Sequence, residues 1–86
     1  MAFQSGKTLA ELEIGQRAIV KDVVGEGRMM VRLLEMGFVP GVSVALVKRA
    51  PLGDPLELRL RGYHVSLRRA EAGAVLVEAR ADEARA

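Results

Sequence analysis

The chain has 86 residues, of which 50% are hydrophobic and only 3% are aromatic, and its formal net charge is +2. A chain of this length forms one small domain, whose core must here be built from aliphatic side chains. The scarcity of aromatic residues and the balanced charge argue against a dedicated nucleic-acid binder, the absence of cysteine excludes disulfides and thiolate metal sites, and no apolar run is long enough for direct membrane insertion. We therefore expect a cytoplasmic protein.

The first part of the chain predicts a short helical turn followed by a strand. Thr8 and Glu11 have the spacing of a capping box, in which each side chain accepts a hydrogen bond from the other residue's backbone amide. Residues 16–24 are rich in β-branched side chains, and Ala18 and Val20 would share one face of a strand there.

The only helix of more than two turns is predicted over residues 28–36. Its apolar positions form a broad stripe on one side. The stripe consists of Met29, Met30, Leu33, Leu34 and Met36. Arg28, Arg32 and Glu35 fall on the opposite, solvated side of the helix.

The junction after this helix carries two stop signals. Gly37 follows the last helical position, so we expect it to adopt a positive φ and to end the helix in a Schellman motif, with Phe38 folding back onto Leu33. Residues 39–42 place proline and glycine at the two positions where a type II turn requires them. The chain is therefore expected to reverse at once into a second strand that ends near residue 50.

The following residues predict a loop and then a β-hairpin whose register follows from the sequence. Residues 50–55 contain two prolines and a glycine, which is typical of a turn extended into a longer loop. If residues 61–62 form a two-residue turn, all apolar residues of both strands fall on one face. The expected pairs are Leu60 with Tyr63, Leu58 with Val65 and Leu56 with Leu67. The opposite face would carry Glu57, Arg59, His64 and Ser66.

The last elements are a short helical turn over residues 68–73 and a strand over residues 74–78. Residues 79–86 contain no large apolar side chain, so we expect a domain over residues 1–78 and a flexible tail over residues 79–86. Five short strands joined by tight turns, with one helix inserted after the first strand, predict a mainly β fold, a small and partly open barrel.

Four segments of the chain together resemble the FeoA family. They are residues 33–41 (LLEMGFVPG), 50–55 (APLGDP), 61–63 (RGY) and 66–72 (SLRRAEA), and the similarity extends from about Thr8 to Val77. This resemblance implies an SH3-like fold and a small cytoplasmic protein of bacterial ferrous iron uptake. In that family the expected role is to bind and regulate the FeoB-type membrane GTPase transporter, without enzymatic activity.

Two alternative functions remain open at this point. The same SH3-like module forms the C-terminal domain of iron- and manganese-dependent repressors of the diphtheria toxin repressor type, so a metal-responsive module is one alternative. SH3-like barrels also occur in ribosomal and translation proteins, so a nucleic-acid-binding barrel is the other, although few aromatic side chains are present to stack on bases.

The sequence offers few groups for a metal site or for catalysis. His64 is the single histidine, and Glu57 or Glu71 could join it in a low-affinity site for a divalent metal. The alternative is an ordinary surface histidine. Residues 25–28 lack the further glycine, lysine and Ser/Thr of a phosphate-binding loop, and no catalytic set is evident, so we expect no enzyme and no bound cofactor.

Exposed apolar residues are the first candidates for partner contacts. A leucine at the crest of the loop over residues 50–55 has little core within reach, and one edge of the helix stripe is expected to stay exposed and to dock the transporter or a second copy of the chain. These candidates are Leu52 on the loop and Met29, Leu33 and Phe38 at the helix. The alternatives are a loop folded back on the barrel and a stripe that is fully core.

Basic residues are the second candidates. Arg59, Arg61, Arg68 and Arg69 make the hairpin and the turn after it positive. Such a face would meet an acidic surface or a phosphate. The alternative is a solvated face whose charge is balanced by Glu57 and Glu71.

Overall fold

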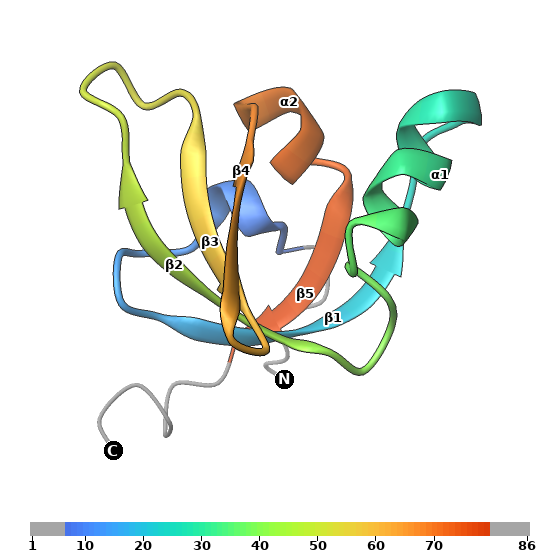
Figure 1. The fold of residues 1–86 in the computed structure, drawn as a ribbon, viewed down its shortest axis with the longest axis horizontal. Helices are drawn as coiled ribbons and strands as arrows, with labels where there is room; N and C mark the ends of the chain where they lie inside the picture. Colours follow the sequence, from blue (N-terminus) through green and yellow to red (C-terminus); the bar gives the residue numbers. More distant parts are fainter. Residues whose placement is uncertain (1–6, 80–86) are drawn as a thin grey trace.

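The computed structural model describes residues 7–79 as one strongly curled antiparallel sheet with helical segments at its open side (Figure 1). The elements are the 3-10 turn η1 (Leu9–Glu11), β1 (Arg17–Val23), α1 (Gly27–Glu35), β2 (Ser43–Arg49), β3 (Leu56–Leu60), β4 (Tyr63–Leu67), α2 (Arg69–Ala72) and β5 (Val75–Ala79). The strand order is β4-β3-β2-β1-β5, so the barrel stays open between β4 and β5. The predicted mainly β, partly open barrel with a helix after the first strand is confirmed.

The core lies inside the curl of the sheet. Strand residues that point inward alternate with residues that point outward, as a half-buried strand requires. The inward residues that are almost completely buried are Ala18, Val20, Val44, Leu46, Leu56, Leu58, Leu60, Leu67, Val75 and Val77. The outward residues of the same strands, among them Arg17, Ser43 and Arg59, are exposed.

The predicted end of α1 is confirmed in detail. Gly37 has φ 112°, its amide donates to the Leu34 carbonyl at 3.0 Å, and the Phe38 amide donates to the Leu33 carbonyl at 3.1 Å. These are the two hydrogen bonds of a Schellman motif. The turn over residues 39–42 follows directly, with a 3.1 Å hydrogen bond from the Val42 amide to the Val39 carbonyl.

The expected exposed edge at Leu33 or Phe38 is wrong. Leu33 is 1% exposed and Phe38 is 0% exposed, because the Schellman turn directs both side chains into the core. The exposed apolar residues of α1 are instead Leu34, on the outer edge of the stripe, and Val31, which lies outside it.

The predicted register of the β3–β4 hairpin is confirmed for all pairs, from Leu56 opposite Leu67 to Leu60 opposite Tyr63. One side chain departs from the expected apolar face. Tyr63 is exposed, because its hydroxyl reaches out to donate a 2.7 Å hydrogen bond to the Met36 carbonyl at the end of α1.

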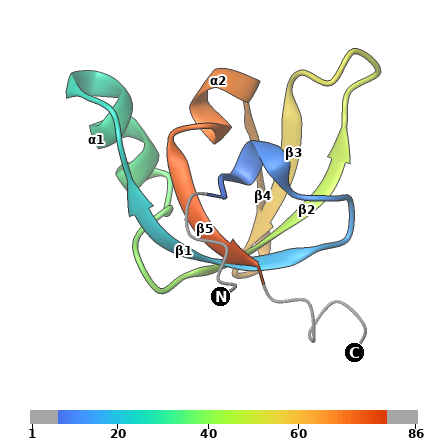
Figure 2. The ribbon, with the colours of Figure 1, turned by 180° about the vertical axis from the view of Figure 1, so that it is seen from behind.

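The N-terminal segment and α2 cover the open side of the sheet. Figure 2 shows η1 and α2 beside each other at the mouth of the curl, between β5 and the β3–β4 hairpin. In η1 the Thr8 amide donates to the Glu11 carboxylate at 2.9 Å, as the capping-box spacing predicted. β5 ends at Ala79, one residue beyond the expected domain boundary, and the rest of the predicted tail lies outside the described residues. In the described part of the chain, no helix has the length and hydropathy needed to span a membrane.

Candidate functional site

The loop between β2 and β3, residues 50–55, holds the most exposed large apolar side chain of the described chain. Leu52 is 93% exposed at the crest of this loop, which we call the Leu52 loop. The Gly53 amide donates to the Ala50 carbonyl at 2.7 Å, and the Ala50 amide donates to the Pro55 carbonyl at 3.0 Å. These two bonds close the loop at its base and its tip, so Leu52 points away from the core rather than folding back on it.

A further contact joins the Leu52 loop to α2. The Asp54 carboxylate accepts a 3.1 Å hydrogen bond from the Arg69 amide, at the first residue of that helix. A helix leaves its first amides without intrahelical partners, so an acceptor from another segment satisfies one of them. The Leu52 loop is therefore positioned by the body of the domain.

The second apolar surface is a strip on the outside of α1, which we call the α1 rim. It consists of Val31, which is 53% exposed, and Leu34. The two residues lie three positions apart and therefore on the same side of the helix. Met29, the remaining candidate from the sequence, is partly buried against the core and does not belong to this strip.

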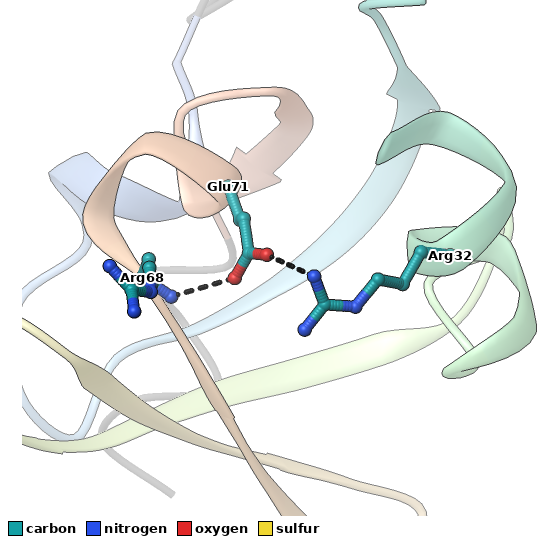
Figure 3. A network of polar contacts seen from close by, with 3 residues as sticks. All are labelled: Arg32, Arg68 and Glu71. Atoms are coloured by element: carbon teal, nitrogen blue, oxygen red, sulfur yellow. Dashed lines mark hydrogen bonds and ion pairs between the residues drawn. The ribbon is translucent and has the colours of Figure 1, made fainter. Parts of the chain in front are cut away.

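Glu71 connects α2 to α1 (Figure 3). One carboxylate oxygen accepts a 2.8 Å hydrogen bond from Arg32 Nη1 on α1, and the other accepts a 2.9 Å hydrogen bond from the Arg68 amide at the start of α2. The Glu71 side chain is only 12% exposed, whereas that of Arg32 is 62% exposed. One oxygen of Glu71 thus joins α2 to α1, and the other caps the start of α2 itself.

The metal candidates lie on two parts of the fold, with His64 and Glu57 on the β3–β4 hairpin and Glu71 in α2. His64 lies opposite Arg59, and Glu57 lies opposite Ser66 and Lys48 in the sheet register. The carboxylate of Glu71 is engaged with the two helices, as described above. Within residues 7–79, no three His, Cys, Asp or Glu side chains are close enough together to hold a metal ion.

Arg59 and Arg61 line a cleft of about 620 Å³ on the outer face of the sheet. The cleft also contains Arg17, which the sequence interpretation did not select. Its outward direction follows from the alternation in β1, but its position across β2 from Arg59 depends on the strand order. The cleft lies at the end of β3 opposite to the Leu52 loop, so Arg59 and Arg61 belong to a different surface from Leu52. The other two basic candidates, Arg68 and Arg69, lie at the start of α2, where the Arg69 amide contacts the Leu52 loop.

Residues 7–79 match the model of the FeoA domain family. A region of the Fe(2+) transport protein A/Fe(2+) transporter FeoB fusion protein of Porphyromonas gingivalis is 46% identical to this chain over 70 residues. These residues are 81% of this chain, and the chain spans only 8% of the length of the fusion protein.

Solved structures with the same fold include two proteins of clear sequence similarity. The FeoA-like protein from Clostridium acetobutylicum has a TM-score of 0.81 and 39% identity, over 92% of this chain and 90% of that chain. FeoA of Stenotrophomonas maltophilia, solved with zinc and described as a prokaryotic SH3 domain protein, has a TM-score of 0.73 and 35% identity, over 83% of this chain and 88% of that chain. The SH3-like fold implied by the sequence resemblance is thus confirmed.

A manganese-dependent transcriptional repressor shares the fold at lower sequence identity. Its TM-score is 0.80 and its identity 14%, over 93% of this chain and 44% of that chain. At that identity the likeness concerns the fold alone, so it adds no support for a role in metal sensing.

Proposed function

Because this chain belongs to the FeoA domain family, we propose that it is a small cytoplasmic accessory protein of bacterial ferrous iron uptake, which binds and regulates a FeoB-type membrane GTPase transporter. The observation that carries this proposal is the Porphyromonas gingivalis protein, in which a region 46% identical to this chain is fused to the transporter FeoB. A fusion keeps two domains at a high effective concentration, an arrangement that favours partners whose function requires contact.

The Leu52 loop is the first contact surface in this proposal. Transferring a fully exposed leucine side chain from water into an apolar pocket contributes about 1.5–3 kcal/mol. The hydrogen bonds at Ala50, Gly53 and Asp54 already fix the loop, so binding loses little conformational entropy. A single exposed leucine on a fixed loop therefore suits an anchor for a partner's pocket.

The α1 rim is the second contact surface. The Leu52 loop and α1 lie at the same end of the molecule, on either side of α2 (Figure 1). A partner that covers α2 would reach both apolar surfaces at once. The proposal assigns no enzymatic activity to the chain itself, because the exposed groups at this end are suited to contact rather than to bond making.

Replacing Leu52 with aspartate tests the proposal. We expect Leu52→Asp to weaken binding to the transporter's isolated GTPase domain at least tenfold, which corresponds to about 1.4 kcal/mol, and to abolish any change in its GTP hydrolysis rate. The variant should keep the melting temperature of the wild type, since substitutions of exposed side chains usually change stability by less than about 0.5 kcal/mol.

Ile14→Asp is the matched control, because Ile14 is an exposed apolar residue that lies in neither surface. It should bind the GTPase domain like the wild type in the same titration. If Leu52→Asp also binds like the wild type, the Leu52 loop is not the anchor. If the wild-type chain itself fails to bind any part of the transporter, the proposed function is wrong.

A further inference from the structure

Three arginines and a floor of small residues form a groove on the outer face of the sheet. In the register of the central strands, Ala45 of β2 lies opposite Arg17 of β1 on one side and opposite Arg59 of β3 on the other. Neighbouring strands are about 4.8 Å apart, so the backbones at Arg17 and Arg59 are roughly 10 Å apart across β2. Ser43 continues the floor toward the β3–β4 turn, where Arg61 stands at the end of the groove.

The shape of the groove follows from side-chain size. The floor positions on β2 carry serine and alanine, whereas the flanking strands carry the longest side chains of the protein. Ala45 is 8% exposed, although it is on the outer face between Arg17 and Arg59. The resulting cleft of about 620 Å³ falls within the range of ligand-binding clefts, which is roughly 300–1,000 Å³.

Two of the arginines of the groove, Arg59 and Arg61, carry charge that no acidic group of the described residues pairs with. Within residues 7–79, the side chains of Arg59 and Arg61 form no hydrogen bond and no ion pair. The acidic residues on the same face of the sheet lie opposite other residues. Glu57 lies opposite Lys48, and Glu78 pairs with Lys21 at 3.5 Å. Two guanidinium groups therefore face the cleft with their donors available.

We propose that this groove binds a short acidic segment of a partner protein in an extended conformation. A guanidinium group presents a planar fork of donors that matches a carboxylate, and the pairing is stronger than that of a lysine. Alternate side chains of an extended segment are about 7 Å apart, so two carboxylates of such a segment can reach Arg59 and Arg61, which are two positions apart in the chain and both line the cleft.

The observations favour a peptide over a nucleic acid. A single-stranded nucleic acid is held by aromatic side chains that stack on its bases. The exposed tyrosine of the hairpin, Tyr63, instead has its hydroxyl bound to the Met36 carbonyl. None of the residues that line the cleft is aromatic, and two arginines with available donors would neutralise few phosphates. The inference is independent of the proposed transporter contact, since the groove and the Leu52 loop lie at opposite ends of β3.

A labelled peptide of alternating glutamate and glycine, followed by fluorescence anisotropy at low salt, tests the groove in the full chain. We expect saturable binding that weakens about fivefold in Arg59→Gln or Arg61→Gln and about 20-fold in the double variant. Arg28→Gln on α1 removes the same charge outside the groove and should leave the affinity unchanged. All variants should keep the wild-type melting temperature, because these side chains are exposed.

Three results would overturn the proposal. The first is equal binding of a matched peptide with glutamine in place of each glutamate, or no saturable binding of either peptide. The second is the same loss of affinity in Arg28→Gln, which would indicate a general charge effect. The third is that inorganic phosphate or a single-stranded oligonucleotide binds more tightly than the acidic peptide and shows the same dependence on Arg59 and Arg61. This result would assign the groove to phosphate.

Discussion

At the scale of single residues, Gly37 is the position where both the backbone and a neighbour exclude a side chain. Its φ of 112° is unfavourable for any residue with a Cβ. A Cβ built at Gly37 would also collide with the Tyr63 hydroxyl, which needs that space to reach the Met36 carbonyl. The positive φ follows from the helix-ending pattern in the sequence, whereas the approach of Tyr63 depends on how the hairpin packs against α1.

Replacing Gly37 with alanine should destabilise the protein by about 2–3 kcal/mol. Backbone strain contributes about 1–2 kcal/mol and the displaced Tyr63 hydrogen bond about 1 kcal/mol. Urea unfolding measures the loss. Gly41→Ala is the control, since Gly41 also has a positive φ of 95° but a Cβ added there would meet no atom within 4 Å, and it should lose only the strain part.

A double variant separates the two contributions at Gly37. Tyr63→Phe removes the hydroxyl with which the new Cβ collides, so the combined loss in Gly37→Ala/Tyr63→Phe should be smaller than the sum of the single losses by about 1 kcal/mol. Additive losses would show that Tyr63 does not restrict this position.

At the scale of elements, Glu71 fixes the position of α1 relative to α2. The carboxylate is mostly buried, and it accepts a 2.8 Å hydrogen bond from Arg32 of α1 and a 2.9 Å hydrogen bond from the Arg68 amide at the start of its own helix. We expect Glu71→Gln to lower the free energy of unfolding by about 1 kcal/mol, because it keeps one acceptor for the Arg68 amide but loses the charge that pairs with Arg32.

The ion pair between Lys21 and Glu78 is the matched control for this prediction. Its partners are 57% and 59% exposed and 3.5 Å apart, so Glu78→Gln should change stability by less than about 0.5 kcal/mol. Chemical denaturation of both variants at low and high salt makes the comparison. An equal effect of the two substitutions would mean that Glu71 acts only as a surface charge.

Elements differ in how far the sequence predicts them. The register of the β3–β4 hairpin follows from the alternation of apolar residues, because a slip by one residue would turn the whole apolar face outward. The exposed edge of α1 does not follow in this way. A broad apolar stripe leaves open which part of it meets the sheet, and the Schellman turn decides this by turning Phe38 inward and leaving Val31 and Leu34 outside.

At the scale of the whole molecule, the open side of the sheet is closed by the segment that precedes β1. The Val77 amide of β5 donates to the Lys7 carbonyl at 2.9 Å, and Leu9 and Leu12 are buried in the mouth of the curl. From the end of β2, the Arg49 guanidinium donates to the carbonyls of Ala10 and Leu12, at 3.1 and 2.6 Å. The N-terminal turn thus spans from one side of the barrel to the other (Figure 2).

This closure and the basic groove both depend on the order of the strands in the sheet. Local sequence patterns do not predict that order. The sequence predicts η1 from its capping spacing but gives no sign that it binds Arg49. It also selects Arg59 and Arg61 from the hairpin alone, but Arg17 joins them only because β1 lies beside β2 in the sheet. Contacts between distant segments are therefore the part that sequence reasoning missed, both in the fold and in the candidate site.

Arg49→Met should therefore destabilise the whole domain rather than a local segment. It keeps most of the aliphatic length but removes both hydrogen bonds to the N-terminal turn, so we expect a loss of about 2 kcal/mol in urea unfolding. The amide of Val77 should also exchange its hydrogen faster, because the N-terminal segment, whose Lys7 carbonyl accepts from that amide, loses its support. Lys48→Met, at the neighbouring exposed position, should change stability by less than about 0.5 kcal/mol. If both variants unfold alike, the barrel is held closed by the burial of Leu9 and Leu12 alone, and Arg49 adds only a surface contact.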